Sequence, residues 1–278
     1  MTVKKLALIV LLAVFVAILG FSVYKMVEYI TDDESQKVEQ LNKEQEALLE
    51  AIAAMAETTT PEPTATPAPE PTKNAKPEEP DYMSMFTIEE INDEIAARIK
   101  GKSYAEDATI PLSDLRYLKI MHYGFDGKVR EGEMIVNKAI AEITIEVFKE
   151  LFEIAYPIQK MVLIDEYDAD DELSMADNNT SAFNFRFISG TKTLSNHAMG
   201  LAIDINPLYN PYIFTDKNGN TVVQPANGQP FVNRNSNSRY FIKENDDLYC
   251  IFLKHGFTWG GDWQTKKDYQ HFEYALEN

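Results

Sequence analysis

Two short segments concentrate the side chains of this sequence that could carry out chemistry. Residues 195–204 contain His197 and Asp204, and a second segment near the C-terminus contains Asp268 and His271. Two histidines and one aspartate form a ligand set typical of a catalytic zinc ion, which keeps its fourth position for water. Asp268 lies three residues before a predicted ligand. It would therefore be close to the metal and available as a general base.

The first segment predicts a loop followed by a strand. Residues 200–205 alternate small and apolar side chains, which is typical of a buried strand, and Asp204 lies on it. His197 would sit on the loop that enters this strand. Gly200 would let the backbone turn or approach a neighbouring segment closely, because it has no side chain to block the approach.

The second segment predicts another strand. With the two-residue period of a strand, His271 and Glu273 share one face, and Phe272 and Tyr274 share the other. His271 would then lie on a strand, and His197 on the loop that leads into the other strand.

Taken together, the two segments follow the pattern S-x-H-x-x-G-x-A-x-D, then W-G-G-D-W and D-x-x-H-F, at residues 195–204, 259–263 and 268–272. This pattern resembles the bacterial zinc peptidases of the D-alanyl-D-alanine carboxypeptidase (VanY-like) and L-alanyl-D-glutamate endopeptidase group. The resemblance implies that Zn2+ is bound by His197, Asp204 and His271, and that Asp268 is the catalytic acid and base. It also implies that the substrate is the stem peptide of peptidoglycan.

The resemblance leaves the cleaved bond open. The sequence of the second motif, with Asp268 as the base, resembles the endopeptidase branch, whose base is an aspartate. The carboxypeptidase branch more often has a glutamate at this position. Asn184, Arg186 and the long N-terminal part of the domain suit a D-alanyl-D-alanine carboxypeptidase equally well. A non-catalytic wall-binding module is the alternative from another class, although every residue that hydrolysis requires is present.

Arg186 is the cationic residue that the resemblance places in the cleft. The family has an arginine upstream of its first zinc histidine, and a guanidinium can bind a substrate carboxylate or a developing oxyanion through two parallel hydrogen bonds. The alternative for Arg186 is a surface ion pair with the acidic segment 168–179. That segment is expected to be a solvated loop rather than a calcium site, because the EF-hand order and its closing glutamate are missing.

Further residues are predicted to line the substrate cleft. They are Ser195 in the first motif, Tyr209 after the zinc-binding strand, and Trp259 and Trp263, which could instead belong to the core. Asp262 is expected to accept a hydrogen bond from a ligand histidine and so orient it.

Composition divides the chain into four parts. Residues 1–25 predict a transmembrane anchor, because an apolar run over 6–24 follows two lysines, which places the N-terminus inside. A cleaved signal peptide is the alternative, but no small-x-small cleavage site follows the run. Residues 26–57 favour either a solvated helical stalk or a short coiled coil that pairs anchors. Residues 58–83, which hold seven of the 13 prolines, predict an extended linker.

Residues 84–278 are the predicted zinc peptidase domain, which the anchor would place on the outer face of the cell membrane. The net charge of the chain is −18, which argues against nucleic acid as a partner. The single cysteine, Cys250, excludes an intrachain disulfide and is expected to be a small buried hydrophobic residue.

The expected fold class of the domain is α+β, with one small, mainly antiparallel sheet, helices packed against it and the zinc cleft on its exposed face. Helices are predicted over 88–99, capped by Thr87, over 140–154, and over 246–255, capped by Asn245. Besides the two motif segments, strands are predicted over 115–123, 133–136 and 161–164.

Overall fold

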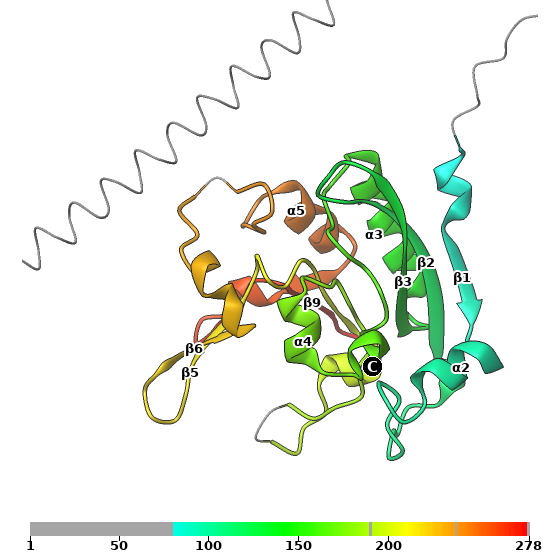
Figure 1. The fold of residues 1–278 in the computed structure, drawn as a ribbon, viewed down its shortest axis with the longest axis horizontal. Coiled ribbons are helices and arrows are strands. Elements are labelled where there is room, and N and C mark those ends of the chain that lie inside the picture. Colours follow the sequence, from blue (N-terminus) through cyan, green and yellow to red (C-terminus); the bar gives the residue numbers. More distant parts are fainter. Residues whose placement is uncertain (1–79, 189–190, 237, 277–278) are drawn as a thin grey trace, which may run out of the picture. The chain divides into compact units, whose positions relative to one another are not determined.

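The computed structural model describes residues 80–188, 191–236 and 238–276. The predicted anchor, the stalk and most of the linker lie outside the described residues. Within the described part, no helix is both long and apolar enough to cross a membrane. The fold class is α+β as expected, but the strands form three small antiparallel sheets rather than one (Figure 1).

Each sheet has three strands, and two of the sheets pair strands that are distant in sequence. In order across each sheet, the strands are β1 (Thr87–Glu90), β2 (Leu115–Tyr123) and β3 (Val129–Asn137); β4 (Ala202–Asp204), β9 (His271–Tyr274) and β7 (Phe257–Trp259); and β6 (Thr221–Gln224), β5 (Tyr212–Thr215) and β8 (Lys267–Asp268). The hairpin of β5 and β6 extends away from the rest of the fold (Figure 1).

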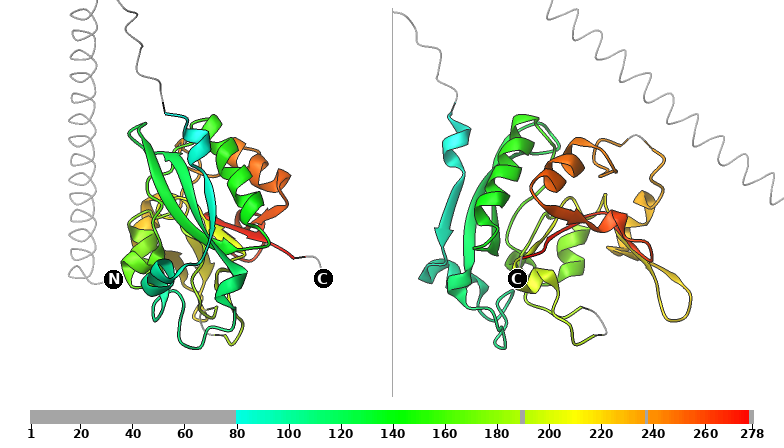
Figure 2. Two further views of the ribbon diagram at one scale, coloured as in Figure 1. Left: turned by 90° about the vertical axis from the view of Figure 1, so that its right-hand side faces the viewer. Right: turned by 180° about the vertical axis from the view of Figure 1, so that it is seen from behind.

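Short helices connect and cover the sheets. They are α2 (Asp93–Ile99), α3 (Ala141–Glu153), α4 (Asp171–Ala176) and α5 (Asp247–Lys254). The longest of them, α3, lies between the first sheet and α5 in both side views (Figure 2). Its apolar side chains recur at helical spacing, which lets one face pack on the sheet and the other approach α5.

The first sheet is buried on both faces, because its long central strand carries apolar side chains on alternate sides. Leu118 and Ile120 face the main core, whereas Leu115 and Tyr117 belong to a second apolar cluster with residues of α2 and of the segment 183–198. Apolar side chains therefore occur on both faces of β2, interrupted by the half-buried Arg116 and Lys119.

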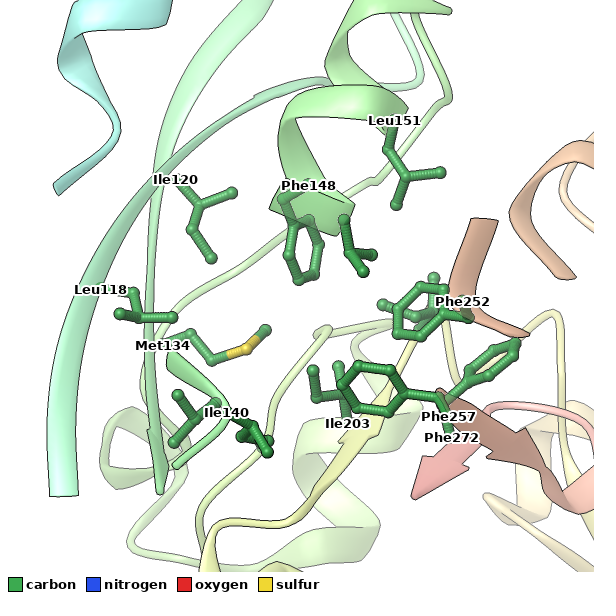
Figure 3. Packing of buried hydrophobic residues seen from close by; sticks show 14 of the residues in the cluster. Leu118, Ile120, Met134, Ile140, Phe148, Leu151, Ile203, Phe252, Phe257 and Phe272 are labelled. Atoms are coloured by element: carbon green, nitrogen blue, oxygen red, sulfur yellow. The ribbon is translucent and has the colours of Figure 1, made fainter. Parts of the chain in front are cut away.

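The main core joins the first sheet, α3, α5 and the second sheet (Figure 3). Phe148 of α3 and Phe252 of α5 meet edge to face, and Phe252 stacks on Phe272 of β9 with ring centroids 4.1 Å apart. Phe272 therefore anchors the strand that carries His271, since adjacent strand residues point to opposite faces.

Several local predictions are wrong for identifiable reasons. Residues 87–90 form the edge strand β1 because they pair with β2, and the helix begins only at Asp93, where Asn92 accepts a hydrogen bond from the amide of Ile95 (2.9 Å). The carboxylate that caps α5 belongs to Asp246, not to Asn245. Cys250 is exposed rather than buried, because it lies on the solvent side of α5.

The predicted strand over 161–164 does not form. Met161 and Leu163 are buried as expected, but the segment continues into a 3-10 helix, Ile164–Tyr167. Its backbone contact with β3 is a single hydrogen bond, from the amide of Glu133 to the carbonyl of Met161 (3.0 Å). The Asn179 side chain takes the place of a partner strand by bonding both the amide and the carbonyl of Val162.

Candidate metal centre

Three side chains from the two motif segments converge in the second sheet. The Nε2 atom of His197 lies 3.1 Å from Nδ1 of His271 and 3.3 Å from Oδ2 of Asp204. Nδ1 of His271 in turn lies 3.1 Å from Oδ1 of Asp204. Among the described residues, this is the group of histidine, cysteine and acidic side chains whose donor atoms are placed to share a metal ion.

Strand pairing brings two of the three together. Strands β4 and β9 are antiparallel neighbours, and Asp204 is the direct partner of His271 in their register. Side chains of directly opposite residues point to the same face of a sheet, so the carboxylate and the imidazole meet. Residues 67 positions apart in the chain thus become neighbours.

His197 is placed by the turn that precedes β4. It lies in a 3-10 helix, Asn196–Met199, whose first turn is capped by the hydroxyl of Ser195 (3.3 Å from the His197 amide). The turn ends at Gly200 with φ +65°, and a Cβ there would lie 2.6 Å from the amide nitrogen of Asn137. Gly200 therefore serves both purposes that its position in the motif predicts, a left-handed turn and close contact with a neighbouring strand.

The spacing of the donors fits a tetrahedral metal. Ligand atoms about 2.0–2.1 Å from a tetrahedral zinc ion lie about 3.3 Å from one another. The two imidazole nitrogens that face each other, Nε2 of His197 and Nδ1 of His271, lie 3.1 Å apart, close to that edge length. Asp204 approaches the two rings through different oxygens, Oδ1 toward His271 and Oδ2 toward His197. With one donor atom taken from each residue, all three lie within 4.8 Å of one another. Two imidazoles and one carboxylate are also a donor set that leaves a further coordination position for water or substrate.

The outer nitrogens of both imidazoles have partners that fix the rings. Nδ1 of His197 lies 2.6 Å from the carbonyl oxygen of Ala182, and Nε2 of His271 lies 3.1 Å from Oε2 of Glu273. Glu273 is itself held by the side-chain amide of Asn196 (2.7 Å). These contacts direct the opposite nitrogen of each ring toward Asp204, which is the usual arrangement around a metal site.

The orienting role expected of Asp262 is wrong. Asp262 is exposed and its carboxylate contacts the hydroxyl of Tyr249 instead (3.4 Å). Glu273 takes this role because it shares a strand face with His271, a relation that the two-residue period already indicated. The Ala182 carbonyl could not be found in this way, since a backbone oxygen leaves no signal in the sequence.

The charges of the cluster are strongly coupled. Burial by itself would raise the pKa of Asp204, but the two imidazoles outweigh it and hold that pKa well below its usual range. Burial would lower the pKa of His271, yet its hydrogen bonds to Asp204 and Glu273 raise it to about 10. Because a metal and a proton compete for the same lone pair, binding of a cation here should release protons.

Asp268 lies next to this cluster without taking part in its hydrogen bonds. Its Oδ1 atom is buried and has no hydrogen-bond partner among the described residues. Burial raises the pKa of Asp268 to about 7, and the neighbouring imidazoles oppose that rise. A carboxyl group with a pKa near neutrality can both accept and return a proton, as a general acid and base must.

A glycine makes room for Asp268. A Cβ on Gly260 would lie 2.8 Å from the Cβ of Asp268 and 3.3 Å from the Cβ of His271. The glycine pair after Trp259 therefore lets the 3-10 helix Gly260–Asp262 pack directly on the site. This is a close approach that a side chain would block.

Arg186 is held away from the cluster by an ion pair. Its guanidinium contacts the carboxylate of Asp171 in α4, which is the alternative that the sequence left open. Its backbone nevertheless runs beside the first motif, because the carbonyl of Arg186 accepts a hydrogen bond from the amide of Ser195 (3.1 Å). A role of Arg186 in substrate binding stays a prediction.

The acidic segment 168–179 is partly helical and most of its carboxylates are neutralised or used as caps. Asp170 caps α4 by accepting from the amide of Leu173 (3.0 Å). The ion pairs are Lys102–Asp168, Arg186–Asp171 and Lys160–Asp177. Carboxylates that are paired in this way do not offer the converging oxygens that calcium requires.

The remaining residues predicted to bind substrate have different surroundings. Trp263 is half-buried and its ring centroid lies 5.4 Å from that of His271, so it borders the site. Trp259 lies in the main core and donates from Nε1 to the carbonyl of Tyr269 (2.9 Å). Tyr209 packs in an aromatic cluster with Phe125, Phe231 and Tyr240. The substrate-binding roles of these residues and of Ser195 stay predictions.

Comparison with known proteins agrees with the motif. Residues 189–274 match the family model described as D-alanyl-D-alanine carboxypeptidase. The matched segment contains the three clustered donors and Asp268, and it begins after Arg186. No curated protein and no solved structure matched the chain in these comparisons. Over residues 189–274, the match supports the family that the sequence indicated, the D-alanyl-D-alanine carboxypeptidase family of peptidases.

Proposed function

We propose that this protein is a zinc-dependent peptidase that removes the terminal D-alanine from the stem peptides of peptidoglycan. The observation that carries the proposal is the convergence of His197, Asp204 and His271, whose donor atoms lie within 4.8 Å of one another, beside Asp268, whose Oδ1 atom has no hydrogen-bond partner among the described residues. The family match supplies the substrate class.

The three converging side chains would hold the ion, and the residues around them would carry the rest of the reaction. A bound zinc ion supplies Lewis-acid polarisation of the scissile carbonyl and makes water more acidic. Asp268 accepts a proton from the attacking water as the new C–O bond forms. It then returns that proton to the leaving amine when the C–N bond breaks. Burial of its carboxyl group is what brings its pKa into the range needed for both transfers.

In this proposal Arg186 donates hydrogen bonds either to the oxyanion that develops on the scissile carbonyl or to the substrate carboxylate. For this role it would have to release Asp171, with which it is paired. Because this ion pair is partly solvent-exposed, it contributes little to stability. Replacing the Asp171 carboxylate by a substrate carboxylate would therefore cost little free energy.

The proposed location is the outer face of the cell membrane. An apolar run over 6–24 after two lysines supports an uncleaved anchor, and the proline-rich linker supports a domain held away from the bilayer. A paired stalk over 26–57 would bring two such domains together. Fractionation of cells, followed by protease treatment of intact and lysed spheroplasts, tests this location directly.

The activity is tested with the purified full-length chain in detergent, loaded with zinc or stripped by a chelator. Incubation with an L-Ala-D-Glu-containing pentapeptide ending in D-Ala-D-Ala should release free D-alanine, as measured by mass spectrometry. Asp268→Asn should lose about 100- to 10,000-fold in kcat. Asp107→Asn, at an exposed position, is the matched control and should remain active.

Two other products would overturn parts of the proposal. Release of L-alanine with a free carboxyl group would assign the chain to the endopeptidase branch, while leaving the metal site and Asp268 in place. Binding of the peptide with no hydrolysis by the zinc-loaded chain would favour a non-catalytic wall-binding module.

A further inference from the structure

Lys266 carries a positive charge that no acidic side chain of the described residues neutralises. Its Nζ atom lies 4.4 Å from the ring centroid of Trp263 and 5.3 Å from that of Tyr212. No carboxylate of the described residues lies within ion-pair distance of it, although the chain is strongly acidic. Aromatic faces attract an ammonium group without cancelling its charge. The charge of Lys266 is thus held in place and still available to an anion.

Both aromatic rings that hold Lys266 belong to the border of the metal centre. Trp263 approaches the ring of His271 at 5.4 Å, and Tyr212 is the direct strand partner of Asp268. The ammonium also acts on Asp268 through space, because it lowers the pKa that burial raises. Lys266 therefore stands at the rim of the site, on the side of the catalytic carboxylate.

Three other cations, Arg186, Arg234 and Lys267, are already engaged. Arg186 is paired with Asp171. Arg234 is half-buried, lies over two aromatic rings and donates to backbone and amide oxygens. Lys267, the next residue along from Lys266, donates from Nζ to the carbonyl of Gly261 (2.9 Å). Of these four cations, Lys266 is the one with neither an anionic nor a hydrogen-bonding partner among the described residues.

We propose that Lys266 binds the C-terminal carboxylate of the peptide substrate and thereby selects substrates with a free C-terminus. This inference rests on the proposed peptidase function and adds the residue that would decide between exopeptidase and endopeptidase action. An endopeptidase cleaves inside a chain and has no use for a cation at this place. A carboxypeptidase must recognise a terminal carboxylate one residue beyond the scissile bond.

The position of the charge suits this task. The carboxylate of the departing residue lies close to the amine that Asp268 protonates, and Lys266 is two residues from Asp268 in the sequence. A lysine ammonium acts as a compact point charge without a fixed fork geometry, so it can accept carboxylates of different orientation. Trp263 and Tyr212 limit the side-chain freedom that would otherwise oppose binding.

The test compares two peptides that differ at one group, a stem peptide ending in D-Ala-D-Ala and the same peptide with a C-terminal amide. The wild-type full-length chain should favour the free acid by about 10- to 100-fold in kcat/KM, which is the usual value of a hydrogen bond to a charged group. Lys266→Met should lose that preference by raising KM for the acid and leaving the amide unchanged. Lys266→Arg should retain most of it.

Two matched variants serve as controls. Lys217→Met removes a lysine at the exposed tip of the β5–β6 hairpin and should keep the wild-type preference. Arg186→Met tests the other candidate cation. If Arg186→Met abolishes the preference for the acid and Lys266→Met keeps it, the inference is overturned.

Binding without turnover separates this inference from the proposed function. In an Asp268→Asn background, calorimetry should show about 10- to 100-fold weaker binding of the acid peptide when Lys266 is also replaced by methionine, and equal binding of the amide. Equal binding of the acid with and without Lys266 would overturn the inference. Failure of the wild-type chain to cleave either peptide would instead contradict the proposed function, and the binding comparison would still decide on Lys266.

Discussion

Replacement of Glu273 by glutamine isolates the contribution of an orienting residue to metal binding. The carboxylate of Glu273 lies 3.1 Å from Nε2 of His271 and is held in place by Asn196. Its hydrogen bond to His271 keeps the pKa of Glu273 below its usual range, so the group is ionised at neutral pH. Glutamine keeps the shape and an acceptor oxygen but removes the charge that makes the imidazole a better ligand.

The expected magnitude follows from the exposure of the contact. Loss of an orienting carboxylate usually weakens metal affinity by 10- to 100-fold, or about 1.4–2.7 kcal/mol. The side chain of Glu273 is 29% exposed, so solvent screens part of its charge. We therefore expect Glu273→Gln to weaken zinc affinity about tenfold, at the lower end of this range.

The affinity is measured by competition with a chromophoric chelator at neutral pH. Glu244→Gln, an exposed substitution of the same kind on the segment before α5, is the matched control and should bind zinc like the wild type. If Glu273→Gln binds zinc as tightly as the control, then Glu273 does not orient His271 toward a metal. If both variants weaken binding equally, the effect is one of net charge and not of this contact.

Three further substitutions test the site and its support. In chelator-treated protein at pH 8, Asp268→Asn should raise Tm, because burial raises the pKa of Asp268 to about 7 in the folded state and ionisation of the buried carboxyl group destabilises the fold. The gain should shrink as the pH falls and vanish below about pH 3, where this carboxyl group is protonated in both the folded and the unfolded state. Gly260→Ala should cost about 1–3 kcal/mol in denaturant unfolding and also lower kcat, because its Cβ would meet the backbone of Asp268 at 2.7 Å. Phe252→Ala should cost about 3–5 kcal/mol, because Phe252 is fully buried between α3 and β9. A Tm that is unchanged or lowered for Asp268→Asn at pH 8, or a loss below 1 kcal/mol for either of the others, would contradict these assignments.

The ligand set could be predicted from sequence because each donor lies in a short segment with its own local signal. Residues 195–204 and 268–271 contain a glycine turn, a strand period and the donors at fixed offsets. The strand period also put Glu273 beside His271. The rest of the surroundings depends on contacts between distant segments. The partner of His197 is the carbonyl of Ala182, and the partner of Arg186 is Asp171 rather than the cleft.

The fold was predicted least well where an element depends on a distant partner. The apolar periods of β2, β3 and α3 are long enough to indicate those elements by themselves. Residues 87–90 have the pattern of a helix start, yet β2 offers an open edge and its backbone hydrogen bonds turn them into a strand. Residues 161–164 have the composition of a strand and lie beside the edge strand β3, but a single backbone–backbone hydrogen bond, from the amide of Glu133 to the carbonyl of Met161 (3.0 Å), joins the two segments in the described structure. Local propensity decides only where tertiary contacts do not override it.

The sequence by itself determined which atoms can bind a metal, the short-range turns and strands that carry them, and the segment that resembles the peptidase family. Tertiary structure decided that Asp204 and His271 face each other in the β4–β9 register, that Arg186 is paired with Asp171, and that Lys266 has no acidic partner in the part of the chain that the structure describes. The physical reason is the range of the forces involved. Backbone conformation and side-chain alternation are set over a few residues, whereas burial, pairing and the effective strength of a charge depend on everything that folds around it.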